Sequence, residues 1–183
     1  VDERCRYPRG KALGGTSVIN GMLYTRGSPG DFKHWKQLGV DGWDYYEHVL
    51  PAFKKSEKSF LKFKNRCNFH GKNGSLAVSS NSFETPMAKI FIDGLKAMNL
   101  PEIDFNADDS IGFGRMQSNT KNGKRQSAYE AFLEPILKRK NLHIMLESRV
   151  TRVIIENGTA KGVEVLRNRK RMKIKAFKEV KNA

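Results

Sequence analysis

A set of closely spaced glycines near the start of the chain restricts the fold more than any other feature. It comprises Gly10, Gly14, Gly15, Gly21, Gly27 and Gly30. Adjacent glycines let the backbone take positive φ angles and approach a ligand closely. After them, Thr16 or Ser17 can cap a helix that runs through Val18, Ile19, Met22 and Leu23. The free N–H groups at such a helix start suit a phosphate, although a turn and cap without any ligand explains the same residues.

Three further helices are expected from capping signals. Residues 45–57 place apolar side chains on one face behind Asp44, a candidate N-cap. Thr85 is followed by a proline, a favourable helix start, and helical spacing continues through Met87, Ile90, Phe91, Gly94, Leu95 and Met98. Ser127 and Glu130 form a capping box for a helix with the inner face Tyr129, Phe132, Leu133, Ile136 and Leu137. Helices are therefore expected in the middle of the chain and again near residue 130.

Strand signals dominate the last third of the chain. Before it, residues 76–78 form one short predicted strand after a turn, and residues 104–123 are polar and irregular. Asn157-Gly158 is typical of a hairpin turn. The later strands alternate polar and apolar side chains and cover residues 142–146, 150–156, 162–166 and 172–177. The prediction is a mixed α/β protein whose sheet is mostly a β-meander in its last third.

Basic side chains outnumber acidic ones, with 34 Lys and Arg against 19 Asp and Glu and a formal net charge of +15. The excess is concentrated in two basic clusters, within residues 54–66 and 167–181. Phe60 and Phe63 in the first and Phe177 in the second are too few for the regular interleaving of a nucleic-acid stacking platform, and no nucleic-acid-binding motif accompanies the clusters. Solvated surfaces explain both clusters, and contact with a polyanion is the alternative.

Other site classes receive little support from the sequence. Cys5 and Cys67 allow one disulfide at most, and Cys67 with His70 lacks a second ligand pair for zinc. N-glycosylation patterns begin at Asn73 and Asn157, which favours a secreted protein. No apolar run approaches the roughly 20 residues of a membrane span. The chain starts without Met and stops in a basic stretch, so we expect it to be an internal piece of a longer protein.

The glycine-rich segment, read from residue 10 to residue 35, resembles the first signature of the glucose-methanol-choline (GMC) oxidoreductases, which are FAD-dependent enzymes. Residues 4–9 before it resemble the insect glucose dehydrogenase-like branch of that family. Lys33 stands where the family usually has an acidic or small polar residue. This difference affects a local surface contact and not flavin binding, because the position lies beyond the glycine-rich residues 10–27. Further similarities follow in family order at residues 39–43, 49–57, 69–78, 124–142 and 148–164.

The resemblance implies an α/β fold made of part of a Rossmann-like FAD-binding domain, including its β-meander, and part of a substrate-binding or cap region. Residues 1–33 and 121–183 would be segments of the FAD-binding domain, and residues 34–120 the helical and substrate-binding region. The family's dinucleotide motif GxGxxG would lie upstream of this chain. Gly112-Phe113-Gly114 does not replace it, because no third glycine follows at the required spacing.

The resemblance also implies which positions contact the cofactor. Along the flavin and pyrophosphate of FAD it places Thr16, Asn20, Gly21, Met22 and Leu23. The backbone of Val150 would meet the adenine, and further candidates are Lys11, Ala12 and Gly15. Without a ligand, Asn20 can simply cap and Met22 can simply pack, and a valine in a strand needs no functional reason.

The implied chemistry is oxidation of a CH–OH group, in which a histidine near the family's C-terminus takes the alcohol proton and hydride passes to flavin N5. The chain has four histidines, and none of them lies in a motif that matches this catalytic histidine: His34, His48, His70 and His143. We therefore expect this chain to hold no catalytic residue and no metal ligand. The expected partners are an alcohol or sugar substrate and an electron acceptor, with no specific nucleic acid. The alternatives are a cationic binding module and a non-functional truncated product.

Overall fold

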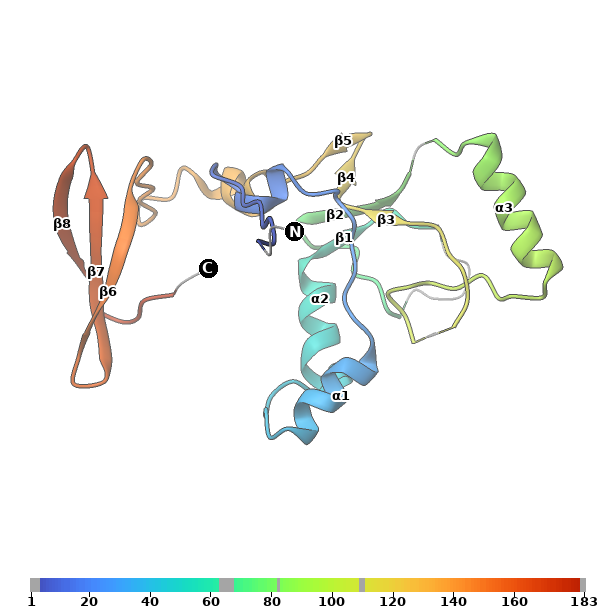
Figure 1. The fold of residues 1–183 in the computed structure, drawn as a ribbon, viewed down its shortest axis with the longest axis horizontal. Helices are drawn as coiled ribbons and strands as arrows, with labels where there is room; N and C mark the ends of the chain where they lie inside the picture. The colour runs from blue at the N-terminus through green and yellow to red at the C-terminus, as the bar shows by residue number, and fades with distance from the viewer. Residues whose placement is uncertain (1–3, 63–67, 82, 109–110, 182–183) are drawn as a thin grey trace. The chain divides into compact units, whose positions relative to one another are not determined.

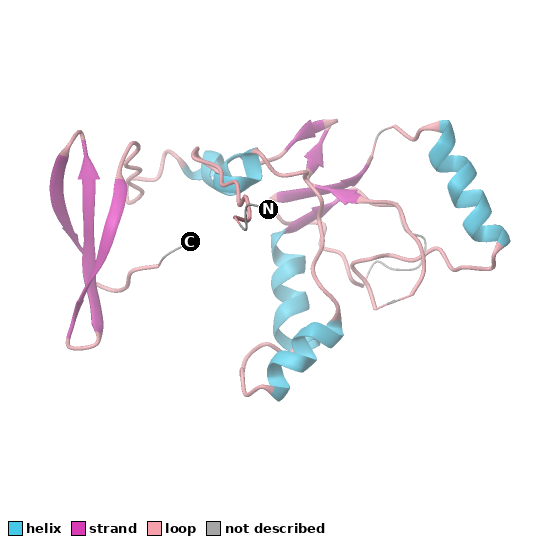
Figure 2. Cartoon of the chain, viewed as in Figure 1, coloured by secondary structure: helices cyan, strands magenta, loops and turns pink. Residues whose placement is uncertain are grey.

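In the computed structural model, the described residues are 4–62, 68–81, 83–108 and 111–181. The chain divides into two compact units, Val1–Leu137 and Lys138–Ala183. Figure 1 labels the helices and strands, and Figure 2 shows that the second unit is built mainly from strands. The first unit contains the glycine-rich segment, and the second contains the predicted meander.

The first unit alternates short helices with short strands. Its helices, with single 3-10 or π turns labelled η, are η1 (Gly15–Val18), α1 (Pro29–Gln37), η2 (Tyr45–Val49), α2 (Leu50–Ser56), α3 (Pro86–Ala97), η3 (Tyr129–Leu133) and η4 (Glu134–Ile136). Its strands are β1 (Glu57–Ser59), β2 (Leu76–Ser80), β3 (Gln117–Ser118), β4 (Thr120–Lys121) and β5 (Lys124–Arg125). They form a three-stranded sheet in the order β1-β2-β3 and a separate β4-β5 pair.

Polar side chains fix where the helices of the first unit begin. Ser28 and Asp31 form a capping box at α1. The Asp44 carboxylate accepts hydrogen bonds from two backbone N–H groups of η2, and Oγ1 of Thr85 caps α3, as the sequence predicts for both. With these starts set, α1 and η2 bury a small apolar cluster made of Phe32, Tyr45 and Val49.

The three-stranded sheet joins distant parts of the first unit. β1 pairs with β2 in parallel, and β2 pairs with β3 in antiparallel orientation. Ala77 and Val78 on β2 are fully buried. Leu23 forms an isolated antiparallel bridge to Ser118 on β3. The end of the glycine-rich segment is therefore attached to this sheet.

The second unit is the predicted antiparallel meander. It consists of β6 (Arg149–Glu156), β7 (Thr159–Arg167) and β8 (Lys170–Lys175). Asn157 and Gly158 have φ values of 49° and 72°, and two positive φ angles in a two-residue connection are typical of a type I′ hairpin turn. The α/β class, the meander and the turn are confirmed.

The predicted strand at residues 142–146 is absent. These residues are coil after the turn that follows η4, and no strand pairs with them in the described part of the chain. Alternating side chains are not sufficient for a strand, because its N–H and C=O groups need a neighbouring strand as partner. Conversely, of the three strands in the β1-β2-β3 sheet, the sequence predicts only β2.

Two predicted helices are less regular than expected. In the segment 45–57, the π turn η2 precedes α2, because Pro51 has no N–H to continue an α-helical ladder back to the preceding turn. The capping box between Ser127 and Glu130 is present, with the N–H of Ser127 2.7 Å from the Glu130 carboxylate. The helix after it is only the short pair η3 and η4, and Pro135 interrupts its hydrogen bonds in the same way.

Candidate functional site

The glycine-rich segment of residues 10–27, which we call the glycine loop, folds tightly on itself. Gly14 has a φ of +94°, a left-handed conformation that favours glycine. A Cβ placed on Gly10 would lie 2.2 Å from the carbonyl oxygen of Gly15. Oγ1 of Thr16 accepts a hydrogen bond from the N–H of Gly10 at 3.3 Å and so closes the turn. The backbone path of the loop therefore requires glycine at positions 10 and 14.

The predicted helix through the glycine loop is not formed. Only the four residues of η1 are helical, and no side chain caps them. Oδ1 of Asn20 accepts a hydrogen bond from the N–H of Met22 at 3.1 Å, and Met22 has a φ of +61°, so the chain turns away from the helix. A phosphate site at the start of a long helix is therefore not supported, and a turn, rather than helical phase, places Asn20.

A segment more than 100 residues away holds the glycine loop in place. Nη1 of Arg125 donates to the carbonyl oxygen of Ser17 at 3.0 Å and to Oδ1 of Asn20 at 2.8 Å. Oγ of Ser17 accepts from the N–H of Ala128 at 2.8 Å and donates to the carbonyl oxygen of Gly14 at 2.5 Å. This role of Arg125 is not predicted from the sequence, because no local pattern links β5 to the loop.

The residues predicted to contact the cofactor lie mostly at the surface of their units. Three are half-buried: Gly15, Thr16 and Met22. Five are exposed: Lys11, Ala12, Asn20, Gly21 and Leu23. Val150 belongs to the second unit, where it pairs with Val165 across β6 and β7 and is 53% exposed.

At the end of the glycine loop, Arg26 enters a buried ion network. Its guanidinium bonds to the Glu57 carboxylate and to the carbonyl oxygen of Phe69, the latter at 2.5 Å. Nδ1 of His70 lies 2.8 Å from Oε1 of Glu57, and Nε2 lies 2.6 Å from Oδ2 of Asp104. The Arg26, Glu57 and Asp104 side chains are fully buried. The network contains two basic and two acidic groups, so its charges balance when all are ionised.

Two amide side chains extend the network to β3. Nε2 of Gln117 donates to Oδ1 of Asp104 at 2.6 Å, and Nδ2 of Asn106 donates to Oε1 of Gln117 at 2.7 Å. Oδ1 of Asn106 accepts from the backbone N–H of Arg26 at 2.8 Å, while its Nδ2 also reaches the carbonyl oxygen of Tyr24 at 3.2 Å. The chain leaving the glycine loop is thereby fixed to the sheet.

Hydrogen bonds determine the protonation states in this network. Burial alone would lower the pKa of His70, but hydrogen bonds to Asp104 and Glu57, with the charges of both carboxylates, raise that pKa to about 9. Burial would raise the pKa of Asp104, but its bonds to His70, the Asn106 N–H and Gln117 hold that pKa below its usual range. His70 is therefore a buried cation at neutral pH. The other three histidines are exposed.

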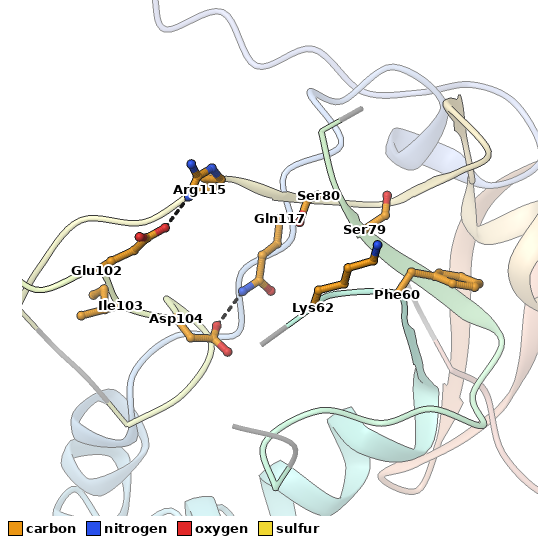
Figure 3. A pocket seen from close by; sticks show the side chains of 9 residues that line it. All are labelled: Phe60, Lys62, Ser79, Ser80, Glu102, Ile103, Asp104, Arg115 and Gln117. Carbon is orange, nitrogen blue, oxygen red and sulfur yellow. Dashed lines mark hydrogen bonds and ion pairs between the residues drawn. The ribbon is translucent and has the colours of Figure 1, made fainter. Parts of the chain in front are cut away.

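A cavity of about 440 Å³ lies beside the ion network (Figure 3). Its lining comprises Phe60, Lys62, Ser79, Ser80, Glu102, Ile103, Asp104, Arg115 and Gln117. Figure 3 shows the ion pair between Arg115 and Glu102 and the hydrogen bond from Gln117 to Asp104 among these side chains. Hydroxyl, carboxylate, amide and ammonium groups beside one aromatic ring suit a small polar molecule.

Other classes of site gain no support from the geometry. No group of three or more His, Cys, Asp or Glu side chains in the described ranges is placed to hold a metal ion. Cys67, which a disulfide with Cys5 or a zinc site would need, lies outside the described residues, as do Lys64 and Arg66 of the first basic cluster. The second basic cluster covers β8, whose residues are all exposed. Among the described helices, none is long and apolar enough to cross a bilayer.

Comparison with known proteins settles the family. Residues 1–182, nearly the whole chain, match the family described as GMC oxidoreductase. The chain belongs to the GMC oxidoreductase family. This match confirms the resemblance seen in the glycine loop and in the segments that follow it.

Relatives of this GMC chain include enzymes of insects and bacteria. It is 41% identical to the glucose dehydrogenase (FAD, quinone) of Drosophila pseudoobscura pseudoobscura. The 167 aligned residues cover 90% of this chain and 27% of that protein. It is 39% identical to the oxygen-dependent choline dehydrogenase of Rhizobium etli (strain CIAT 652). Here the 180 aligned residues cover 98% of this chain and 32% of that protein. The chain thus spans between a quarter and a third of the length of these relatives.

Solved GMC-like structures share the fold. Pyridoxine 4-oxidase from Mesorbium loti superposes with a TM-score of 0.82 at 31% identity, over 91% of this chain and 33% of that one. An FAD-dependent oxidoreductase from Chaetomium thermophilum superposes with a TM-score of 0.84 over 92% of this chain and 31% of that one. At 23% identity, this second likeness concerns the fold alone.

Proposed function

We propose that this chain supplies the FAD-binding part of a GMC-type oxidoreductase that oxidises CH–OH groups. The glycine loop carries the proposal, because it exposes Asn20, Gly21 and Leu23 while Arg125 holds it at Ser17 and Asn20. A surface already fixed by the protein binds an extended cofactor with little further loss of conformational freedom. FAD is also named for the Drosophila glucose dehydrogenase, and it agrees with the family of this chain.

Each contact residue has a defined part in the proposal. The loop residues that lie along the flavin and pyrophosphate are Thr16, Asn20, Gly21, Met22 and Leu23. The main chain of Val150 on β6 contacts the adenine, and additional loop contacts come from Lys11, Ala12 and Gly15. Residues 1–33 and 121–183 are then segments of the FAD-binding domain, and residues 34–120 belong to the substrate side.

Bound FAD supplies the hydride acceptor for oxidation of an alcohol or sugar, and an electron acceptor completes the cycle. The residues of this chain bind and orient the cofactor and the substrate. We assign none of them a proton-transfer step: three histidines are exposed and none matches the family's C-terminal catalytic histidine, and carboxylates engage both ring nitrogens of His70. The cavity beside the ion network is the candidate for the substrate side, because its polar groups can hydrogen-bond hydroxyls.

The test is the flavin content of protein made from the complete coding sequence. Asn20→Ala should weaken FAD binding by about 1–3 kcal/mol, because a polar atom of the cofactor loses its partner. The flavin potential should shift, and the ratio of rates for two alcohols should stay the same. Asn81→Ala, at an exposed position of the same unit, is the control.

Two outcomes would contradict the proposal. Retained FAD and potential with a changed alcohol preference in Asn20→Ala would place Asn20 in the substrate pocket. A wild-type protein that holds no flavin but binds heparin in a salt-sensitive way would support the cationic-module alternative, with the exposed basic residues of β8 as its surface.

A further inference from the structure

The contacts of Asn20 determine which end of its amide is already in use. Its Oδ1 accepts hydrogen bonds from the backbone N–H of Met22 at 3.1 Å and from Nη1 of Arg125 at 2.8 Å. A backbone N–H and a guanidinium can only donate. The atom facing both of them must therefore be the amide oxygen, and an exchange of oxygen and nitrogen would put donors against donors.

The other end of the same amide remains available. Nδ2 of Asn20 makes no hydrogen bond with any residue that the structure describes, and the side chain is exposed. An NH₂ group has two donor hydrogens and no acceptor capacity. What Asn20 presents outward is therefore a pair of donors, on a side chain whose rotation is stopped by two bonds to its oxygen.

Arg125 is itself firmly held where it acts. It lies at the end of β5, where its neighbour Lys124 pairs with Lys121. Nη1 donates a second hydrogen bond, to the carbonyl oxygen of Ser17. Because Ser17 is also bonded to the backbone of Ala128, the loop and the β5 segment are joined at more than one point. The guanidinium thus has little freedom to release Asn20.

We infer that Arg125 is a positioning residue of the cofactor site, which fixes Asn20 so that Nδ2 donates to an acceptor atom of the bound cofactor. This inference rests on the proposed function. The acceptor is a carbonyl oxygen or unprotonated ring nitrogen of the flavin, or an oxygen of the pyrophosphate. A ring N–H group is excluded as the partner, because both lone pairs of the amide oxygen already accept, one from Met22 and one from Arg125.

The decisive variant is Asn20→Asp in protein made from the complete coding sequence. The carboxylate still accepts from Met22 and Arg125, so the turn is kept, but it has no hydrogen to donate. FAD affinity of the apoprotein, measured by quenching of flavin fluorescence, should fall at least about tenfold. If Asn20 instead accepted a hydrogen bond from the flavin, this variant would bind FAD as well as wild type or better. That result would overturn the inference.

The positioning role is tested by a double-mutant cycle. Arg125→Met should weaken FAD binding several-fold in the wild type and add almost nothing in Asn20→Ala, because it acts through that amide. Lys124→Met removes the same charge from the same strand without touching the loop and should leave FAD binding unchanged. Additive losses from Arg125→Met and Asn20→Ala would contradict the role of Arg125. This cycle is independent of whether Asn20→Asp folds.

Riboflavin separates the two sources of the acceptor. An Asn20→Asp loss that persists with riboflavin, accompanied by a shifted flavin potential, places the acceptor on the ring system. A loss seen with FAD but not with riboflavin, in the uncharged Asn20→Ala as well as in Asn20→Asp, places it on the pyrophosphate, and both results support a donating Nδ2. A wild-type protein that binds neither compound would refute the proposed function itself, which is a different outcome from equal binding by wild type and Asn20→Asp.

Discussion

Glu57 and Asp104 lie at opposite edges of one imidazole ring, each within hydrogen-bonding distance of a different nitrogen of His70. A ring donates from both nitrogens only when it is protonated, so the bridge between these two carboxylates needs the imidazolium. Glu57 also binds the Arg26 guanidinium at the end of the glycine loop. The charge on His70 therefore supports the position of the loop as well as the local packing.

The stability of the protein should depend on the protonation of His70. Its pKa is raised from the usual 6.5 to about 9, so the folded state binds the proton more tightly than the unfolded state. The corresponding stabilisation, on the order of 3 kcal/mol, is complete below pH 6.5 and is lost as the pH rises through 9. Urea unfolding at pH 6, 7.5 and 9.5 measures this loss.

Asp104 gives the opposite dependence at acid pH. Its pKa is lowered, so its contribution is present above the usual carboxyl range and is lost as the pH falls through the folded-state value.

In His70→Gln the decline in stability between pH 6.5 and 9 should disappear, because no group titrates at that position. An unchanged decline in this variant would show that other groups cause it.

Removal of one carboxylate from the network should be severe. Glu57→Gln leaves the Arg26 guanidinium and the His70 imidazolium buried with one carboxylate fewer, and we expect a loss of about 3–5 kcal/mol in the free energy of unfolding. Asp93→Asn breaks the exposed Lys89–Asp93 pair and should leave the unfolding midpoint almost unchanged. Equal effects of the two substitutions would show that burial does not determine the strength of the network.

The same substitution should have opposite effects at two glycines. At Gly10 an added Cβ meets the carbonyl oxygen of Gly15, so Gly10→Ala should destabilise by about 1–3 kcal/mol and reduce the FAD content. At Gly94, inside α3, nothing lies within 4 Å, so Gly94→Ala should stabilise by about 0.5–1 kcal/mol. Thermal midpoints of the two variants check the prediction, and stabilisation by Gly10→Ala would contradict the close packing of the loop.

The hairpin turn of the second unit should depend on Asn157. Its φ of 49° is costly for alanine but not for glycine, so Asn157→Ala should destabilise β6 and β7 by about 1 kcal/mol and Asn157→Gly should change little. Hydrogen exchange of the strand amides reports this locally. Equal protection in wild type and Asn157→Ala would mean that the turn does not hold the hairpin together.

The parts of the fold that sequence analysis predicted correctly have short-range causes. Asp44 and Thr85 each act on backbone N–H groups two or three residues away, and Asn157-Gly158 forms its turn alone. Such signals can be read from neighbouring residues. The absent strand at residues 142–146 had no such support, because a strand depends on a partner that the sequence does not specify.

The candidate site was only partly accessible from the sequence for the same reason. The family resemblance found the glycine loop, but the capping pattern predicted a helix through Asn20 that the turn at Met22 replaces. Arg125 and the ion network were missed because their partners are distant in the chain: Arg26 is 31 residues from Glu57, and Arg125 is 105 residues from Asn20. Folding alone brings such pairs together.

The bridge between Leu23 and Ser118 has a consequence for how proteins of this kind diversify. Leu23 belongs to the glycine loop, the chain comes back beside it at Ser118, and Arg125 then secures the return. Insertions and deletions are best tolerated where the two ends of a stretch lie close together. Changes of length in exposed turns of the intervening stretch, away from the buried ion network that also supports the loop, should therefore leave the loop's geometry intact.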